Sequence, residues 1–206
     1  MFHHFPLFLA AATLLALLPG PGVLYVATRS IAAGRGEGVA SCLGTALGCS
    51  MQVVAGALGL SALVLASAKL FTLVKLAGAV YLIWMGIGMI RHAGRVELVA
   101  AGRTGVKRAF TDGILVEAFN PKTAAFLLAI LPQFINPAGP VALQFIILGM
   151  ISVALNSCAD LVVALAAGTA KNLLGRGRLM ARVRRASGLI MVGLGVEMLF
   201  TRRSAP

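Results

Sequence analysis

Long apolar segments alternate with short segments rich in Lys and Arg along this chain. Met1–Thr28 and Gly38–Ala68 contain no Asp, Glu, Lys or Arg, and about 20 such residues suffice to cross a bilayer as a helix. The pattern predicts about six membrane-spanning helices, near Phe5–Ser30, Gly38–Ser67, Leu70–Ile90, Phe110–Phe134, Pro140–Thr169 and Ala186–Phe200. The second and fifth segments are long enough to tilt or protrude, and the sixth is short.

We therefore expect an all-α integral membrane protein with one transmembrane domain over residues 1–206. Three segments form repeat one (about 5–90), three form repeat two (about 110–201), and a basic loop (91–109) separates them. Because three is odd, the two repeats would have opposite orientations in the membrane. Their first helices, the first and fourth of the chain, are both broken, at Pro19-Gly20-Pro21-Gly22 and at Asn120-Pro121-Lys122. Matched interruptions in inverted repeats indicate a transporter's binding site.

Composition and charge agree with a membrane protein. The chain is 59% hydrophobic and 12% charged, whereas soluble domains carry about 25% charged residues. A net charge of +12 would suit nucleic-acid binding, but the chain has only two Tyr and one Trp, so no aromatic platform for stacking bases is expected. We therefore expect a lipid bilayer rather than nucleic acid as the partner.

The basic residues predict which ends of the helices face the cytoplasm. Segments 29–37, 91–109 and 171–185 hold 13 of the 18 Lys and Arg, and loops rich in Lys and Arg stay cytoplasmic. These three loops are therefore expected in the cytoplasm and the C-terminus outside. The first segment either spans the membrane or is re-entrant, and its lack of charge leaves both alternatives open.

Few residues suit catalysis or metal binding. The three cysteines, Cys42, Cys49 and Cys158, lie in apolar segments without metal-ligand spacing. The histidines are His3, His4 and His92, at the N-terminus or in a basic loop. We expect no metal site, no cofactor and no enzyme activity.

The first break is expected to line a polar site. Pro19 and Pro21 each remove one backbone N–H donor, while Gly20 and Gly22 permit backbone conformations closed to other residues. Unsatisfied backbone groups are costly in lipid, so the break must face protein or water. A helix starting near Val23 would direct the positive end of its dipole into this site and attract a carboxylate.

Three ionisable residues lie deep in the apolar segments. Lys122 is about 18 Å from either end of its segment, too far for its ammonium to reach the interface. We expect it to contact substrate or a counter-ion, or to form a static ion pair. Asp160 and Glu117 lie toward the cytoplasmic side, where a carboxylate by default carries a proton or binds a cation. Glu117 has the alternative of only pairing with Lys122.

Polar and small residues within the segments complete the candidates. Gln52 and Asn156 lie near the middles of the second and fifth segments, where they would bind a polar substrate or a neighbouring helix. Gly44-x-x-x-Gly48 places two small residues on one helix face, which favours close helix packing and makes a homodimer plausible.

Several motifs together resemble the LysE/RhtB family of bacterial amino-acid exporters, the threonine, homoserine and lysine efflux type. Leu18–Gly22 is similar to the family's Ser-Pro-Gly-Pro motif, and Lys75–Gly86 to its lysine-glycine-tyrosine-leucine-tryptophan-glycine pattern. The strongest match is Phe110–Gly113 followed by Asn120–Phe126 and Leu131–Phe134. Asp160 is similar to an acid in the fifth helix of many members.

The resemblance implies proton-driven efflux of amino acids or related metabolites across the bacterial cytoplasmic (inner) membrane. Two departures concern the substrate: Leu18 replaces a polar residue before Pro19, and Glu117 stands where many members have Asn or an apolar residue. The alternative is a structural or accessory subunit that only packs against a partner. Buried charges at Lys122 and Asp160 argue against that alternative, because packing alone does not require them.

Overall fold

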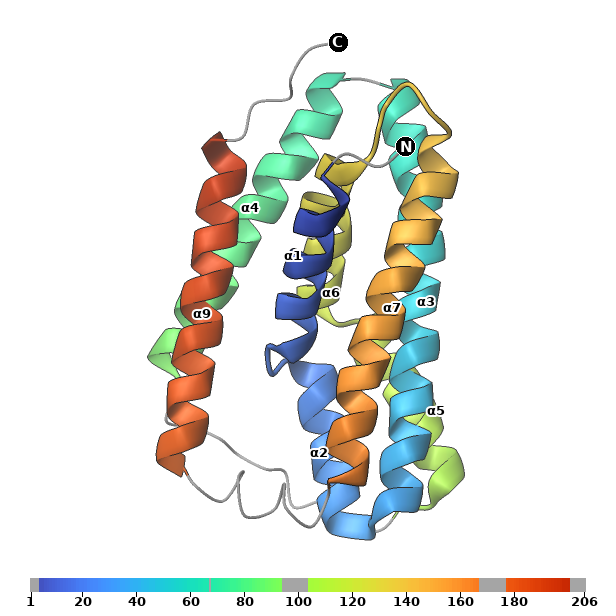
Figure 1. Ribbon diagram of the computed structural model, residues 1–206, viewed down its shortest axis with the longest axis vertical. Helices are drawn as coiled ribbons and strands as arrows, with labels where there is room; N and C mark the ends of the chain where they lie inside the picture. The colour runs from blue at the N-terminus through green and yellow to red at the C-terminus, as the bar shows by residue number, and fades with distance from the viewer. Residues whose placement is uncertain (1–3, 67, 94–103, 167–176, 201–206) are drawn as a thin grey trace.

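The computed structural model describes residues 4–66, 68–93, 104–166 and 177–200. Within these ranges the chain forms helices joined by short connections and contains no strand (Figure 1). The predicted all-α class is confirmed. The helices are α1 (Phe5–Leu17), α2 (Pro21–Ala33), α3 (Arg35–Ala66), α4 (Ala68–Arg91), α5 (Val106–Ala118), α6 (Pro121–Ala125), the π-helix η1 (Phe126–Ile130), the 3-10 helix η2 (Leu131–Phe134), α7 (Val141–Leu165) and α9 (Gly177–Phe200).

The helices extend into the segments that the charge pattern marks as loops. Only Gly34, with φ 88°, separates α2 from α3 within the expected loop 29–37. Helix α9 begins at Gly177 rather than near Ala186, and α5 begins at Val106. Arg and Lys are good helix formers, so a run of basic residues marks where a chain leaves the apolar layer rather than where its helix ends. Residues 94–103 and 171–176 of the expected loops lie outside the described residues.

Three helices in the described part of the chain are long and apolar enough to cross a membrane, or four if the bent pair α1–α2 counts as one span. The three are Arg35–Gly59, Val106–Phe134 and Val141–Leu165, and the pair α1–α2 is bent by 44°. Large apolar side chains cover the outer surface, among them Leu17, Leu58, Trp84, Phe119, Leu189 and Phe200, each at least 60% exposed. Such a surface suits lipid rather than water.

Close helix contacts depend on glycine. A Cβ atom on Gly86 of α4 would lie 2.6 Å from the carbonyl oxygen of Gly188 on α9, and these two helices run side by side (Figure 1). Gly44 and Gly48 of α3 lie against backbone atoms of α5 in the same way. The Gly44-x-x-x-Gly48 face is therefore covered within the chain and gives no support to a homodimer, which remains a prediction without an assigned surface.

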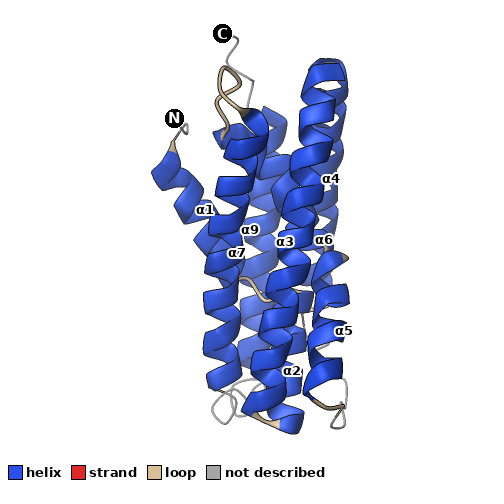
Figure 2. Ribbon diagram, turned by 90° about the vertical axis from the view of Figure 1, so that its right-hand side faces the viewer, coloured by secondary structure: helices blue, strands red, loops and turns tan. Residues whose placement is uncertain are grey.

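The described parts of the three basic segments lie at one end of the helix bundle. The turn between α2 and α3, the start of α5 and the start of α9 all lie at the lower end in Figure 1, whereas the start of α1 and the end of α9 lie at the upper end. The side view shows the long helices running roughly parallel between these two ends (Figure 2). Helices α1 and α2 follow one another from the upper to the lower end, so the bent pair runs the length of the bundle.

Candidate functional site

The first helix break, between α1 and α2, has no hydrogen-bonding side chain of its own. Helix α1 ends at Leu17, and α2 begins at Pro21 with Gly20 as its N-cap and no side-chain cap. The N–H of Leu18 donates to the carbonyls of Leu14 (3.2 Å) and Leu15 (3.1 Å). The last carbonyls of a helix have no partner within the helix, so this buried break requires a donor from elsewhere.

Lys122 of α6 supplies that donor. Its ammonium nitrogen Nζ donates to the carbonyl oxygens of Leu15 (3.1 Å) and Leu18 (3.0 Å), and the residue is only 3% exposed. A Cβ atom on Gly20 would lie 3.0 Å from the Cδ and Cε atoms of Lys122, so Gly20 leaves room for the lysine chain. Among the described residues, Lys122 forms no ion pair with Glu117 or Asp160. The static ion pair, one of the roles expected for Lys122, is therefore absent from the described part of the chain.

The Glu117 carboxylate lies against the first turn of α2. Its Oε1 accepts a hydrogen bond from Thr123 Oγ1 (2.6 Å), and its Oε2 accepts one from Asn120 Nδ2 (2.9 Å). A Cβ atom on Gly22 would collide with Oε2. The N-terminal turn of a helix favours negative charge, so a carboxylate of the protein occupies the position that the dipole of α2 was expected to offer to a ligand.

The second break, between α5 and α6, is capped from both sides. Gln52 of α3 donates from Nε2 to the carbonyl oxygens of Glu117, Ala118 (3.0 Å) and Asn120 (3.4 Å). Asn120 caps α6, because its Oδ1 accepts from the backbone N–H of Lys122 (3.0 Å). Pro121 occupies the first helical position, where a missing N–H is tolerated. The π-helix η1 follows, and π-helical turns are frequent at functional sites.

Asp160 of α7 is joined to α3. It is fully buried, and its Oδ2 accepts from Thr45 Oγ1 (2.9 Å). Its other oxygen, Oδ1, is buried and has no hydrogen-bond partner in the described part of the chain. Glu117 and Lys122 both lie within electrostatic reach of Asp160. Asn156, one turn earlier on α7, is half-buried.

The candidate residues at the two helix breaks and Gln52 thus form one connected cluster. Lys122 contacts Gly20, Glu117 contacts Gly22, and Gln52 caps the helix that carries Glu117. Sequence reasoning missed Thr45, Thr123 and the carbonyls of Leu15 and Leu18. Thr45 precedes Gln52 by seven residues, two helical turns, and so shares its helix face, which was a usable signal. The sequence does not mark the two carbonyls, because every residue has one.

A second polar cluster, also missed, lies at the basic end of the bundle. Glu37 of α3 accepts from the backbone N–H groups of Thr104 (3.2 Å) and Gly105 (2.9 Å), ahead of α5. Arg29 of α2 lies 4.0 Å from both Glu37 and Asp112. Tyr25 of α2 donates from its hydroxyl to the carbonyl of Ala109 on α5 (3.0 Å). Polar contacts therefore join α2, α3 and α5 at this end.

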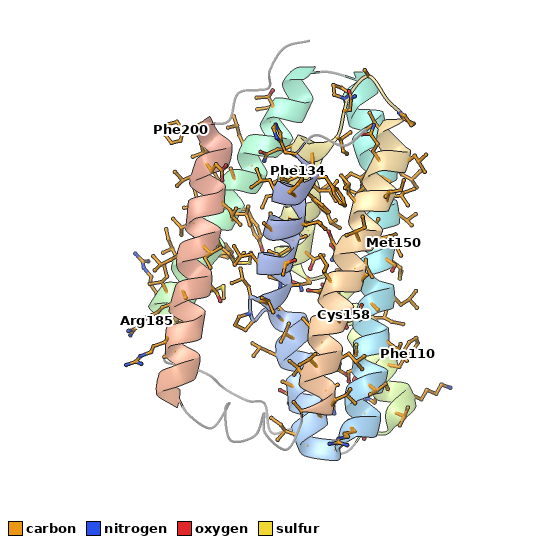
Figure 3. The ribbon with its side chains drawn as sticks, viewed as in Figure 1. Phe110, Phe134, Met150, Cys158, Arg185 and Phe200 are labelled. Atoms are coloured by element: carbon orange, nitrogen blue, oxygen red, sulfur yellow. The ribbon has the colours of Figure 1, made fainter. Side chains whose placement is uncertain are left out.

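Aromatic side chains join the elements at the opposite end. The ring of Phe8 on α1 meets that of Phe134 on η2 edge to face, with centroids 5.5 Å apart, and that of Phe126 at 6.4 Å. Figure 3 shows Phe134 beside the upper part of α1, and Arg185 and Phe200 of α9 pointing away from the bundle. The buried charges lie between a polar end and an apolar end.

Comparison with known proteins gives a consistent family. A family model described as LysE type translocator matches residues 13–202. The homoserine/homoserine lactone efflux protein of Salmonella typhimurium is 40% identical over 147 residues, which cover 71% of each chain. The threonine efflux protein of Escherichia coli is 28% identical over 189 residues, 89% of this chain and 91% of that protein.

An uncharacterized membrane protein of Bacillus subtilis is 28% identical over 205 residues, 95% of this chain and 98% of that protein. No solved structure matches this chain. The relatives are membrane and efflux proteins, in agreement with the apolar helices and the resemblance noted in the motifs.

Proposed function

The chain belongs to the LysE type translocator family, and we propose that it is a secondary active exporter of amino acids or related metabolites, driven by exchange for protons. The names of its relatives support this proposal, because they describe efflux of homoserine, homoserine lactone and threonine. Hydroxylated amino acids and their lactones are therefore the first substrates to test.

The observation that carries the proposal is the burial of three ionisable side chains where two broken helices meet. Glu117 and Asp160 are 0% exposed and Lys122 is 3% exposed. Ionisable residues within membrane helices mark transport paths and proton relays. A subunit that only packs against a partner would gain nothing from this arrangement, so export is favoured over the accessory role.

The proposed topology has six spans, formed by α1–α2, α3, α4, α5 to η2, α7 and α9. These spans make two inverted repeats, about 5–90 and 110–201, around the basic segment 91–109. The breaks at equivalent positions of the first and fourth spans support this arrangement. The described parts of the basic segments lie at one end of the bundle, which supports a cytoplasmic location for that end in the bacterial inner membrane.

The proposed substrate site lies between the Pro19–Gly22 and Asn120–Lys122 breaks. An ammonium has three N–H donors, and Lys122 uses two on carbonyl oxygens, so the third is available for the carboxylate of an amino acid. The first turn of α2 was expected to be a second group for that carboxylate, but it lies against Glu117 instead. Asp160 holds the substrate's ammonium, and Gln52 and Asn156 contact polar parts of the substrate. Glu117 and Asp160 are the candidate proton carriers, and rocking of one repeat against the other alternates access.

The test is uptake into inside-out vesicles that contain the protein, with an imposed pH gradient. The panel comprises labelled homoserine, homoserine lactone, threonine and other amino acids. The proposal predicts accumulation of at least one compound, with loss of accumulation when the gradient is dissipated. No uptake of any compound by correctly inserted protein would remove amino acids and their derivatives as cargo.

Two variants with the same chemical change supply the control. Asp160→Asn removes a buried carboxylate and should abolish accumulation driven by the gradient. Asp112→Asn removes a carboxylate whose side chain is 35% exposed at the basic end and should retain most of it. Equal accumulation by both variants would remove Asp160 from the proposed mechanism.

A further inference from the structure

The two buried carboxylates differ in the hydrogen bonds that they accept. Both oxygens of Glu117 accept from protein donors. Asp160 has one such oxygen, while its Oδ1 has no partner among the described residues although it is buried. The sequence places both residues at similar depth, so only this difference in partners separates their roles.

The partners of Glu117 suit the ionised carboxylate alone. Asn120 Nδ2 can only donate, so a proton on Oε2 would meet the amide hydrogens of Asn120. The hydroxyl of Thr123 carries one hydrogen, and Glu117 Oε1 is the acceptor that it contacts in the described part of the chain. A proton on Oε1 would leave that hydroxyl hydrogen without an acceptor. Buried donors without acceptors are costly, so Glu117 is held as an anion.

The partner of Asp160 suits both protonation states. Thr45 Oγ1 lies 2.9 Å from Asp160 Oδ2 and 2.9 Å from the carbonyl oxygen of Cys42. When Asp160 is ionised, the Thr45 hydroxyl donates to Oδ2. When Oδ2 carries a proton, it donates to Thr45 Oγ1, and the hydroxyl donates to the Cys42 carbonyl instead. A hydroxyl both donates and accepts, so no heavy atom has to move between the two states.

The surroundings of Asp160 make its protonation decide the net charge of the site. The fixed anion Glu117 on α5 balances the cation Lys122 on α6. Among the described residues, the titratable groups within electrostatic reach of Asp160 are Cys42 and Cys49 on α3, Glu117 and Lys122. An ionised Asp160 therefore leaves one net negative charge in the interior, and its free Oδ1 requires a donor. The ammonium of an amino acid supplies both a positive charge and N–H donors.

We propose that Asp160 alone exchanges a proton against the ammonium group of the substrate, with Thr45 as the hydroxyl that reverses its hydrogen bond and Glu117 ionised throughout. This inference rests on the proposed export function. The proton leaves Oδ2 for water on the open side, Thr45 redirects its hydrogen to Oδ2, and the ammonium donates to Oδ1. No covalent bond of the substrate changes, and binding one substrate releases one proton.

The first test measures proton release on binding. L-homoserine or L-threonine is added to the purified full-length protein in weakly buffered detergent solution with a pH-indicator dye, and calorimetry counts the molecules bound. At acidic pH the wild type should release up to one proton per molecule bound, and Asp160→Asn none. Glu117→Gln should also release protons on binding, but over a more acidic range, because Lys122 then balances the charge of ionised Asp160. At low pH, the apparent Kd of the wild type should rise by about tenfold for each unit by which the pH falls, which is the limit for one competing proton. The apparent Kd of Asp160→Asn should not change with pH.

The outcomes separate the inference from the function on which it rests. Binding without proton release, or release that disappears in Glu117→Gln and persists in Asp160→Asn, would overturn the inference and leave the exporter standing. Failure of the folded wild type to bind either compound, together with failure of vesicle uptake, would overturn both.

A second measurement requires no substrate. Infrared difference spectra between acidic and alkaline protein should contain a protonated-carboxyl band that is present in Glu117→Gln and absent in Asp160→Asn. Thr45→Ser keeps the reversing hydroxyl and should keep the band at its wild-type midpoint pH, whereas Thr45→Val should shift that midpoint. Identical midpoints for both Thr45 variants would remove Thr45 from the proposal. A band that vanishes in Glu117→Gln would assign the proton to Glu117 and overturn the proposal.

Discussion

The break between α1 and α2 contains no side chain that can hydrogen-bond, whereas the break between α5 and α6 is bordered by Glu117, Asn120 and Lys122. The side-chain hydrogen bonds at the first break come from the second break, because Lys122 donates to the carbonyls of Leu15 and Leu18. The side-chain hydrogen bonds at the second break come from its own Asn120 and from Gln52 of α3. The two breaks therefore differ in their chemistry.

This inequality connects the two halves of the chain. A movement of α6 that withdraws Lys122 removes the donor from the end of α1, so the first break has to respond to the second. The reverse dependence runs through Gly22 and Glu117, which are in contact. Variants at these positions therefore test whether the two breaks act as one unit, as the proposed site between them requires.

Lys122→Met should have the largest effect. It removes the donor to two buried carbonyls, at a cost of about 1–3 kcal/mol for each acceptor left unpaired, and the only cation within the cluster of Glu117 and Asp160 in the described residues. Thermal unfolding in detergent should show a large loss of stability. Lys107→Met, the same change at an exposed lysine, should stay within about 0.5 kcal/mol of wild type. Equal stability of the two variants would mean that Lys122 does not hold the first break.

Gly22→Ala should have the next largest effect. Its Cβ atom would collide with Oε2 of Glu117, so the hydrogen bond from Asn120 to the carboxylate must lengthen or break, a loss of about 1.5–3 kcal/mol for a bond to a charged group. Gly20→Ala should cost less, because its Cβ meets the flexible methylene chain of Lys122.

The control for both glycine variants is Gly193→Ala. Nothing lies within 4 Å of a Cβ at that position in α9, so alanine should be neutral or stabilising there. Unfolding midpoints in the order Gly193→Ala, Gly20→Ala, Gly22→Ala, from highest to lowest, are expected. A Gly22→Ala midpoint at or above that of Gly193→Ala would contradict the contact between α2 and Glu117.

Gln52→Leu should have the smallest effect and should be confined to the second break. It removes a donor from the carbonyls that end α5, at a cost of about 1–3 kcal/mol for buried acceptors left unpaired. Gln133→Leu is the matched control, because the acceptor of Gln133 in the described part of the chain is the nearby carbonyl of Ala129, four residues earlier (3.0 Å). Hydrogen exchange should rise near residues 117–121 in Gln52→Leu and near both breaks in Lys122→Met. Exchange that rises equally at both breaks in Gln52→Leu would show that the breaks are not separately capped.

The positions of the breaks and of the buried charges follow from the sequence, because Pro-Gly pairs and Lys122 stand out within apolar segments. The partners of these residues do not follow from it. Lys122 bonds to carbonyls 107 and 104 residues away, and backbone carbonyls are the same for every residue type. The last helix was also predicted too short, with a start near Ala186 instead of Gly177, because the basic residues were assigned to a loop although they continue the helix.

Substrate binding between the two breaks is tested most directly by hydrogen exchange of the purified protein with and without saturating L-homoserine, or the compound that the vesicles accumulate. Binding there should slow exchange in peptides covering residues 14–24 and 115–124 together, while a peptide of α9 covering 181–192 stays unchanged. Protection at only one break, or protection confined to α9, would place the substrate elsewhere and contradict a site shared by the two breaks.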